Sequence, residues 1–231
     1  MIIEATFVTS AANASGLPRD GLAEIAMVGR SNVGKSSLIN ALVRQRVART
    51  SAAPGKTRLA NVYRVTRGGA APFYLVDLPG YGYARGDDGE LARIVGAYFG
   101  RVRLKADTTY NTDPDVRSVR LQPDRDSGAL LLIDARHPGL TSDLEAWRWL
   151  TATVGRCAIV VTKIDKLSRA ERLRALKANE AAFENPLLPV SASTGEGLDE
   201  LWKLIERLTS RNPNNRRPPR HLRPPRRLPK S

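Results

Sequence analysis

Gly29-Arg30-Ser31-Asn32-Val33-Gly34-Lys35-Ser36 matches the phosphate-binding loop pattern G-x-x-x-x-G-K-S in full. An apolar run at residues 25–28 precedes this P-loop and residues 37–43 favour a helix after it, which is the strand–loop–helix context that the pattern requires. Glycines allow a tight turn whose backbone N–H groups face the phosphates, and the helix N-terminus adds partial positive charge. The motif predicts that Lys35 reaches the β- and γ-phosphates and that the Ser36 hydroxyl ligates Mg²⁺.

Two further segments fit the same phosphate site. Asp77-Leu78-Pro79-Gly80 closes an apolar run, so Asp77 is expected to hold Mg²⁺, usually through water, while Gly80 leaves room for its N–H to approach the γ-phosphate. Pro54-Gly55-Lys56-Thr57, continued by Arg58-Leu59, lies between the two motifs, and Thr57 is predicted to be a second Mg²⁺ ligand once the γ-phosphate is present. Taken alone, either segment is also compatible with an ordinary turn.

A separate pair of segments indicates which base is bound. Thr162-Lys163-Ile164-Asp165 is similar to the guanine-specificity element, with Thr162 where Asn is more common. The Asp165 carboxylate can accept hydrogen bonds from guanine N1–H and its amine, and adenine would leave it unsatisfied at a cost of about 1–3 kcal/mol. The aliphatic stem of Lys163 can cover the base. Val190-Ser191-Ala192 can present backbone N–H groups to guanine O6.

The pattern around these motifs predicts the fold. Apolar strands alternate with amphipathic helices, which argues for an α/β domain with a mostly parallel sheet and helices on both faces. With the motifs above in this order, the domain resembles a Ras-like P-loop GTPase domain. A turn at Arg67-Gly68-Gly69-Ala70 would make one strand of the six antiparallel. The six strands are expected at residues 24–28, 60–66, 73–76, 129–133, 157–161 and 187–190.

Helices are expected after Lys35, near Asp88, near Ser142 and Ser168, and after Gly197. Ser142 and Ser168 are the expected N-caps, because a serine side chain can accept a hydrogen bond from the first turn. The three indoles are expected to be packing residues of these helices, and they are Trp147, Trp149 and Trp202.

Four regions differ in composition. Residues 1–22 form a lead-in whose Ile2, Ile3 and Phe7 can pack on the domain, which spans 23–209. Within it, residues 101–128 are polar and are expected to be an inserted, exposed and mobile loop, with a dedicated binding loop as the alternative. Residues 210–231 are predicted to be a disordered tail.

Charge points to a polyanionic partner. The net charge is +14, and residues 211–231 alone carry seven Arg, one Lys and six Pro with no acid. RNA is a more natural partner than a membrane surface, and a merely solubilising tail is the alternative reading.

The composition, with 42% hydrophobic and 26% charged residues, is ordinary for a globular protein, and the presence of only one cysteine excludes an internal disulfide framework. The single cysteine, Cys157, lies in an apolar run and is expected to be a buried strand residue. No stretch approaches the roughly 20 apolar residues of a membrane span, and the N-terminus lacks a signal-peptide pattern, so the cytoplasm is the expected location.

Taken in order, the motifs resemble one family, the EngB (YihA/YsxC) ribosome-biogenesis GTPases of the TrmE-Era-EngA-EngB-septin-like class. The residues that carry the resemblance are the P-loop, Thr50 to Thr57, Asp77-Leu78-Pro79-Gly80-Tyr81-Gly82-Tyr83-Ala84, Ile133-Asp134-Ala135-Arg136-His137 and Thr162 to Asp165. The resemblance implies a GTP-hydrolysing monomer that assists assembly of the large ribosomal subunit in bacteria, with a link to cell division and septation. Its implied partners are GTP or GDP and the large-subunit precursor, its rRNA and proteins.

The catalytic set expected from these motifs is Lys35, Thr57, Gly80 and Asn32. Many GTPases orient the attacking water with a Gln after the Asp-x-x-Gly element, but this position is Tyr81, so slow intrinsic turnover is expected. Related GTPases with Asn at the position of Asn32 use it to ligate K⁺, and an Asn that only shapes the loop is the alternative. His137 is expected to be structural.

Two other functions remain open at this stage. An RNA-binding assembly factor could use GTP mainly as a structural ligand, and single-turnover hydrolysis with and without precursor ribosomes would distinguish it. An ATP-dependent P-loop kinase would require Asp165 to be incidental, and competition between GDP and ADP would decide.

Overall fold

The computed structural model describes residues 2–49, 59–81, 96, 98–100 and 128–210. Several predictions therefore lie outside the described residues: the segment Gly55 to Arg58, a helix near Asp88, residues 101–127 and the tail 211–231. Gly128 is described and begins a strand, so the predicted insertion can extend no further than residue 127.

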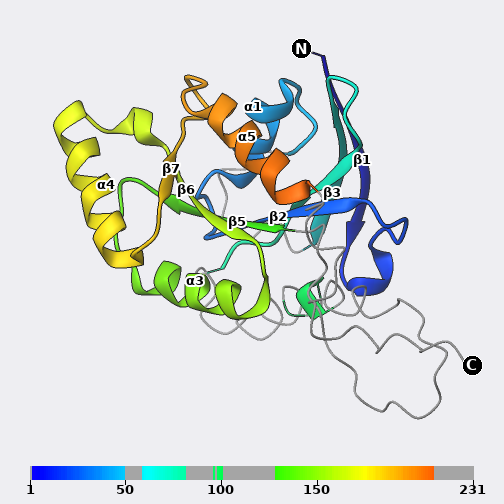
Figure 1. Cartoon of the computed structure of the whole chain (residues 1–231), viewed down its shortest axis with the longest axis horizontal. Coiled ribbons are helices and arrows are strands. Elements are labelled where there is room, and N and C mark those ends of the chain that lie inside the picture. The colour runs from blue at the N-terminus through cyan, green and yellow to red at the C-terminus, as the bar shows by residue number, and fades with distance from the viewer. Residues whose placement is uncertain (1, 50–58, 82–95, 97, 101–127, 211–231) are drawn as a thin grey trace, which may run out of the picture.

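A seven-stranded sheet forms the centre of the described fold, in the order β1-β3-β4-β2-β5-β6-β7 (Figure 1). Strand β3 is antiparallel to both of its neighbours, and the other pairs, β4–β2, β2–β5, β5–β6 and β6–β7, are parallel. The predicted fold class, with one antiparallel strand, is therefore confirmed. The strands are β1 Ile3–Ala11, β2 Ala23–Gly29, β3 Ala60–Arg67, β4 Phe73–Asp77, β5 Gly128–Asp134, β6 Cys157–Thr162 and β7 Leu187–Pro189.

The strand count of six was wrong by one. Residues Ile3–Ala11, expected to be a lead-in, form the edge strand β1 and pair with β3 from Ile3 opposite Arg67 to Ala11 opposite Ala60. Most side chains of this edge strand are exposed, and only Ala5 and Ala11 are buried. That composition gives a weak signal for a strand, although Phe7 does contact the ring of Tyr63.

The turn between β3 and β4 is the predicted hairpin. Gly68 and Gly69 have φ angles of 56° and 77°, and the Ala70 N–H donates to the Arg67 carbonyl at 3.0 Å. Positive φ at both central positions is the two-residue turn whose twist matches that of the strands, which explains the Gly-Gly pair.

Helices cover both faces of the sheet, as predicted (Figure 1). Residues of α1 and α5 join one buried cluster with Met27 and Leu130, whereas residues of α3 and the end of α4 join a second cluster with Val28 and Leu131. Because neighbouring residues of β2 and β5 point to opposite faces, each strand feeds both clusters. The helices are α1 Lys35–Val43, α3 Thr141–Thr153, α4 Arg169–Phe183 and α5 Leu198–Thr209.

The two predicted N-caps differ. Ser168 caps α4 in a capping box with Glu171, as expected. Ser142 does not cap α3, because that helix already begins at Thr141 and its N-cap position is Leu140, which has no side-chain cap. The prediction misplaced this helix start by two residues.

Two of the three tryptophans, Trp147 and Trp202, are buried as predicted. Trp149 is 40% exposed, and its ring packs edge-on against Phe99 with 5.3 Å between centroids.

Cys157 is only partly buried, and burial raises the pKa of its thiol. Among the described residues, no helix is both long and apolar enough to span a bilayer.

Candidate nucleotide-binding site

The predicted site residues lie at one edge of the sheet. Strands β2, β4, β5 and β6 run parallel and end at Gly29, Asp77, Asp134 and Thr162. Ligands of open α/β sheets bind outside the carboxyl ends of the strands, so the loops that follow these four strands form one candidate site.

Lys35 is the buried cation at the centre of this edge. It is the first residue of α1, only 8% exposed, and its Nζ donates to the carbonyls of Gly29 at 3.0 Å and Arg30 at 3.3 Å. Burial lowers the pKa of Lys35, and the charge of Asp77 opposes that shift. The loop therefore curls around its own lysine, which is held by backbone oxygens and has no ion pair with a carboxylate among the described residues.

Ser36 and Asp77 form the second part of the phosphate end. The Ser36 hydroxyl donates to Asp77 Oδ2 at 2.7 Å, and Asp77 is only 1% exposed. Burial raises the pKa of Asp77, although Lys35 and the Ser36 hydrogen bond act in the opposite direction. Its other oxygen, Oδ1, is buried without a hydrogen-bond partner among the described residues.

The donor set here suits Mg²⁺. A buried carboxylate with an unpartnered oxygen beside a serine hydroxyl offers two hard oxygen ligands, and Mg²⁺ at such sites takes its remaining ligands from phosphates and water. No cluster of three or more His, Cys, Asp or Glu occurs among the residues that the structure describes.

The end of the Asp-x-x-Gly segment, together with the residue that follows it, lies directly on the P-loop. The Ser31 N–H donates to the Tyr81 carbonyl at 3.1 Å, and Arg30 and Tyr81 form a parallel bridge. Gly80 touches the same backbone so closely that a Cβ there would lie 2.6 Å from the Ser31 nitrogen. Only glycine fits at position 80 in this arrangement.

Asp143 is a site neighbour that the sequence analysis did not single out. It lies in the first turn of α3, is 1% exposed, accepts the Tyr81 hydroxyl at 2.8 Å and pairs with Arg30 Nε at 3.3 Å. Burial raises the pKa of Asp143, and both partners oppose that shift. An acid in the first turn of a helix is usually exposed and interacts with the helix dipole, so the position of Asp143 in the sequence did not indicate this contact.

The guanine-specificity segment also contacts the P-loop. The Thr162 hydroxyl donates to the carbonyls of Val33 at 2.8 Å and Ile133 at 3.0 Å, as the predicted tie between the two loops requires. Lys163 Nζ donates to the Asn32 carbonyl at 2.5 Å, and its Cε lies 3.8 Å from where a Gly34 side chain would begin. Thr162 therefore makes the loop-to-loop contact for which Asn is more common.

Asp165 and Ser191 form the far end of the site. Ser191 is fully buried and donates its hydroxyl to Asp165 Oδ1 at 2.7 Å, while Lys166 Nζ lies 3.4 Å from Oδ2. The Ser191 hydrogen bond is the main cause that lowers the pKa of Asp165. Ser193 and Thr194 donate their backbone N–H groups to Ser191 Oγ, so the loop after β7 is organised around this serine.

The remaining predicted residues differ in their burial. Ile164 and Val190 are buried, and Ala192 is partly buried against the cluster that contains Val190. Leu59 is exposed just before β3. Asn32 is exposed and has a φ of 62°, a left-handed conformation that Asn adopts more readily than most residues. His137 is exposed, with its N–H bonded to the Asp134 carbonyl.

The fold and the convergence of these motifs define a P-loop GTPase. The family model described as "50S ribosome-binding GTPase" matches residues 24–163. Relatives named probable GTP-binding protein EngB are 42% identical over 212 residues in Chlorobaculum parvum and 38% identical over 206 residues in Solibacter usitatus. These alignments cover 90% and 88% of this chain and 96% and 95% of the relatives. The chain therefore belongs to the EngB family of GTP-binding proteins, and its activity is GTP hydrolysis.

Solved structures share the fold. A crystal structure of a probable GTP-binding protein EngB has a TM-score of 0.54 at 20% identity and covers 81% of this chain and 98% of its own. Era in complex with MgGDPNP and a 16S rRNA segment has a TM-score of 0.63 at 24% identity. The match to Era covers 83% of this chain but only 58% of the Era chain.

Proposed function

We propose that this GTPase hydrolyses GTP with Mg²⁺ at the described edge of the sheet and acts on a precursor of the large ribosomal subunit. The observation that supports the site most directly is the joining of its two ends: Thr162 and Lys163 bond the backbone of the same loop that surrounds Lys35. A nucleotide with its phosphates on that loop would place its base beside Asp165.

Each residue then has a defined task. Lys35 and the N–H groups of the P-loop neutralise the phosphate oxygens as negative charge shifts during transfer. Asp165 accepts the guanine N1–H and amine, and the Lys163 stem covers the base. The Gly80 N–H is the proposed donor to the γ-phosphate.

Mg²⁺ bound by Ser36 and Asp77 would neutralise charge between the β- and γ-phosphates. The unpartnered Asp77 Oδ1 supports this assignment. Era, which shares the fold, was crystallised with MgGDPNP. Thr57 is proposed as the second protein ligand on sequence grounds alone, with Gly55, Lys56, Arg58 and Leu59 forming its loop.

Slow intrinsic turnover is also proposed, because Tyr81 replaces a water-orienting Gln and its hydroxyl is held by Asp143. K⁺ ligated by Asn32 would then supply extra positive charge. Hydrolysis should be several-fold faster in K⁺ than in Na⁺ at equal ionic strength, and this difference should disappear in Asn32→Ala. Equal hydrolysis rates in K⁺ and Na⁺ would contradict a role for K⁺ in hydrolysis.

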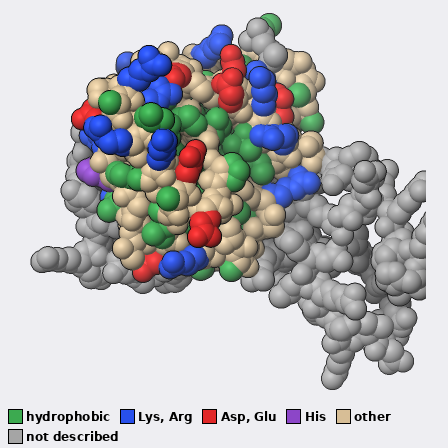
Figure 2. All heavy atoms as spheres, turned by 60° about the vertical axis from the view of Figure 1, so that its left-hand side comes forward, with side chains coloured by type: hydrophobic (Ala, Val, Ile, Leu, Met, Phe, Trp, Pro, Cys, Tyr) green, Lys and Arg blue, Asp and Glu red, His purple; other side chains and the backbone are tan. Residues whose placement is uncertain are grey.

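The ribosomal role rests on the family and on charge. The matching family model is described as a 50S ribosome-binding GTPase, and the chain carries a net charge of +14. On the face turned toward the viewer in Figure 2, basic side chains are spread out with acidic side chains among them. Residues 211–231, which carry seven Arg and one Lys with no acid, are the proposed electrostatic contact with RNA.

Sedimentation with ribosomal particles tests the role. The full chain should cosediment with large-subunit precursors more strongly with a non-hydrolysable GTP analogue than with GDP. Deleting residues 211–231 should weaken this binding and flatten its dependence on salt, because fewer phosphate counterions are released. Nucleotide-independent binding would favour the alternative RNA-binding factor, and no binding in any state would contradict the ribosomal proposal.

The remaining organisation is proposed on sequence grounds. Residues 23–209 would be the GTPase domain, with β1 as an added edge strand, residues 101–127 as an insertion and residues 210–231 as a basic tail. We further propose a cytoplasmic monomer with the family's link to cell division and septation.

A further inference from the structure

Asp134 is a buried acid beside the site that no proposed step uses. It is the last residue of β5, and its side chain is 4% exposed. Four donors surround the carboxylate: Oδ1 accepts the Arg136 backbone N–H and Nε, each at 3.0 Å, and Oδ2 accepts Arg136 Nη2 at 2.7 Å and Lys163 Nζ at 2.9 Å. Burial alone would raise the pKa of Asp134, but these hydrogen bonds outweigh it and hold the pKa well below its usual range.

Lys163 is stretched between this carboxylate and the P-loop. Its backbone is left-handed, with φ of 60°, and the same Nζ that bonds Asp134 also bonds the Asn32 carbonyl. The side chain therefore passes over Gly34 with both ends fixed, one by β6 and one by Asp134 and the loop. A lysine side chain has four rotatable bonds, so the contacts of Nζ with Asp134 and Asn32 are needed to hold Lys163 in one conformation.

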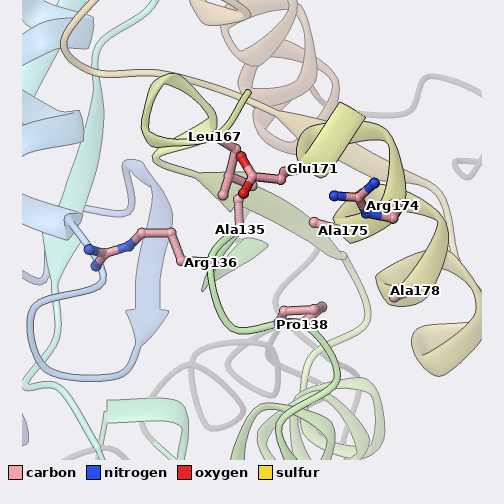
Figure 3. Close-up of a pocket in the computed structure, with 8 residues that line it drawn as sticks. All are labelled: Ala135, Arg136, Pro138, Leu167, Glu171, Arg174, Ala175 and Ala178. Carbon is pink, nitrogen blue, oxygen red and sulfur yellow. The ribbon is translucent and has the colours of Figure 1, made fainter. Parts of the chain in front are cut away.

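Arg136 completes the anchor from the other side. Its guanidinium donates to Asp134 from two nitrogens, and Arg136 also lines a neighbouring hollow of about 340 Å³. Figure 3 shows the Arg136 side chain extending away from the hollow, while Glu171 and Arg174 project from α4 on the opposite side. Asp134 thus lies between two cations, and its loss would leave Lys163 facing the positive charge of Arg136.

We infer that Asp134 is a positioning residue for guanine: by fixing Lys163 Nζ against the Asn32 carbonyl, it sets the surface on which the base lies. This inference rests on the proposed nucleotide site. Both carboxylate oxygens of Asp134 already accept from Arg136 or Lys163, so it would act on binding through Lys163 and leave the chemistry to Lys35 and its neighbours.

The test is Asp134→Asn in the full chain, with Mg²⁺ present. The dissociation constant for fluorescent GDP should rise about tenfold through faster release, and the KM for GTP should rise in parallel, because a charge-assisted hydrogen bond is lost. The kcat should stay within about twofold. Glu206→Gln is the matched control, since it neutralises an ion-paired carboxylate far along α5 and should leave all three constants unchanged.

A double-mutant cycle separates this role from a general structural one. In a Lys163→Met background, which weakens binding by itself, Asp134→Asn should have no further effect. Equal effects in both backgrounds, or unchanged GDP release in Asp134→Asn, would overturn the inference.

If Asp134→Asn does not fold, Arg136→Gln replaces it and should raise the dissociation constant two- to threefold only when Lys163 is present. A wild type that binds no GDP would instead overturn the nucleotide site, and the inference with it.

Discussion

The two ends of the candidate site hold their carboxylates in opposite ways. At the phosphate end, Asp77 is almost fully buried, has an oxygen without a partner among the described residues, and has a pKa raised by burial. At the base end, Asp165 accepts a hydrogen bond from Ser191, and its pKa is lowered.

This difference shows which end needs its ligand. At the base end, Asp165 already accepts a hydrogen bond from Ser191, so this end would be preorganised for the proposed guanine contact. The phosphate end keeps a buried lysine and a buried acid without direct contact, an arrangement that favours the arrival of phosphate and Mg²⁺. Binding energy should therefore be gained at the phosphate end and specificity at the base end.

The largest effect is expected from Lys35→Met. It keeps the aliphatic stem but removes the charge that would neutralise the phosphates, so kcat/KM for GTP should fall by about 100- to 1000-fold. Steady-state phosphate release at saturating Mg²⁺ measures this. Lys177→Met on the exposed side of α4 is the control, and a loss below tenfold for Lys35→Met would mean that the phosphate end is not where the γ-phosphate binds.

Asp165→Asn should change specificity at the base end. The amide can no longer accept from both the guanine N1–H and amine, so GDP affinity should fall about 10- to 100-fold. Xanthine has an oxygen in place of that amine, and the new amide N–H can donate to it, so xanthosine diphosphate should bind better than it does to wild type. Competition binding measures both. Asp199→Asn at the start of α5 should alter neither affinity, and a parallel loss for both nucleotides would remove Asp165 from the base contact.

The sequence predicted well what depends on local order. Six strands follow from apolar runs, and the P-loop motif with its flanking strand and helix placed Lys35 and Ser36 where they are found. The Gly68-Gly69 turn was predictable because only positive φ closes that hairpin. The edge strand β1 was not predicted because most of its side chains are exposed, so its sequence lacks the apolar run that indicates a buried strand.

The missed site residues depend on contacts far apart in the chain. Asp143 meets Tyr81 across 62 positions and Asp134 meets Lys163 across 29, so no local pattern indicates either pair. One signal was available: an acid that ends an apolar strand, as Asp134 does, lies at the same edge as Asp77 when the strands are parallel. That argument gives Asp134 a location but no partner.

The raised pKa of Asp77 predicts how stability depends on pH without a ligand. An acid whose pKa is higher in the folded state stabilises the fold below its unfolded pKa, and this contribution is lost as pH rises through the folded value. Without nucleotide and Mg²⁺, wild type should therefore lose stability relative to Asp77→Asn as pH rises from 4 toward 8. Melting curves across that range measure the difference. Adding GDP and Mg²⁺ should remove this loss of stability in wild type. If wild type and Asp77→Asn show parallel pH profiles of stability without ligand, the raised pKa is not that of Asp77.

The smallest effect is expected from Tyr81→Phe, which removes only the hydroxyl that Asp143 accepts. Unfolding free energy should fall by about 1 kcal/mol. Tyr74→Phe is the matched control, because it removes a hydroxyl bonded to Asp20 at 2.6 Å, away from the P-loop. Denaturant unfolding should show similar losses for the two variants.

Only Tyr81→Phe should also change the ratio of GTP-analogue to GDP affinity, by about two- to threefold. The reason is geometric: the Tyr81 carbonyl accepts the Ser31 N–H, and Gly80 lies against the same loop, so loosening the ring changes where the Gly80 N–H meets the γ-phosphate. GDP makes no such contact. An unchanged ratio would mean that the Tyr81–Asp143 hydrogen bond only stabilises the fold, as the Tyr74–Asp20 hydrogen bond does. Lys35 and Mg²⁺ alone would then distinguish GTP from GDP at the phosphate end.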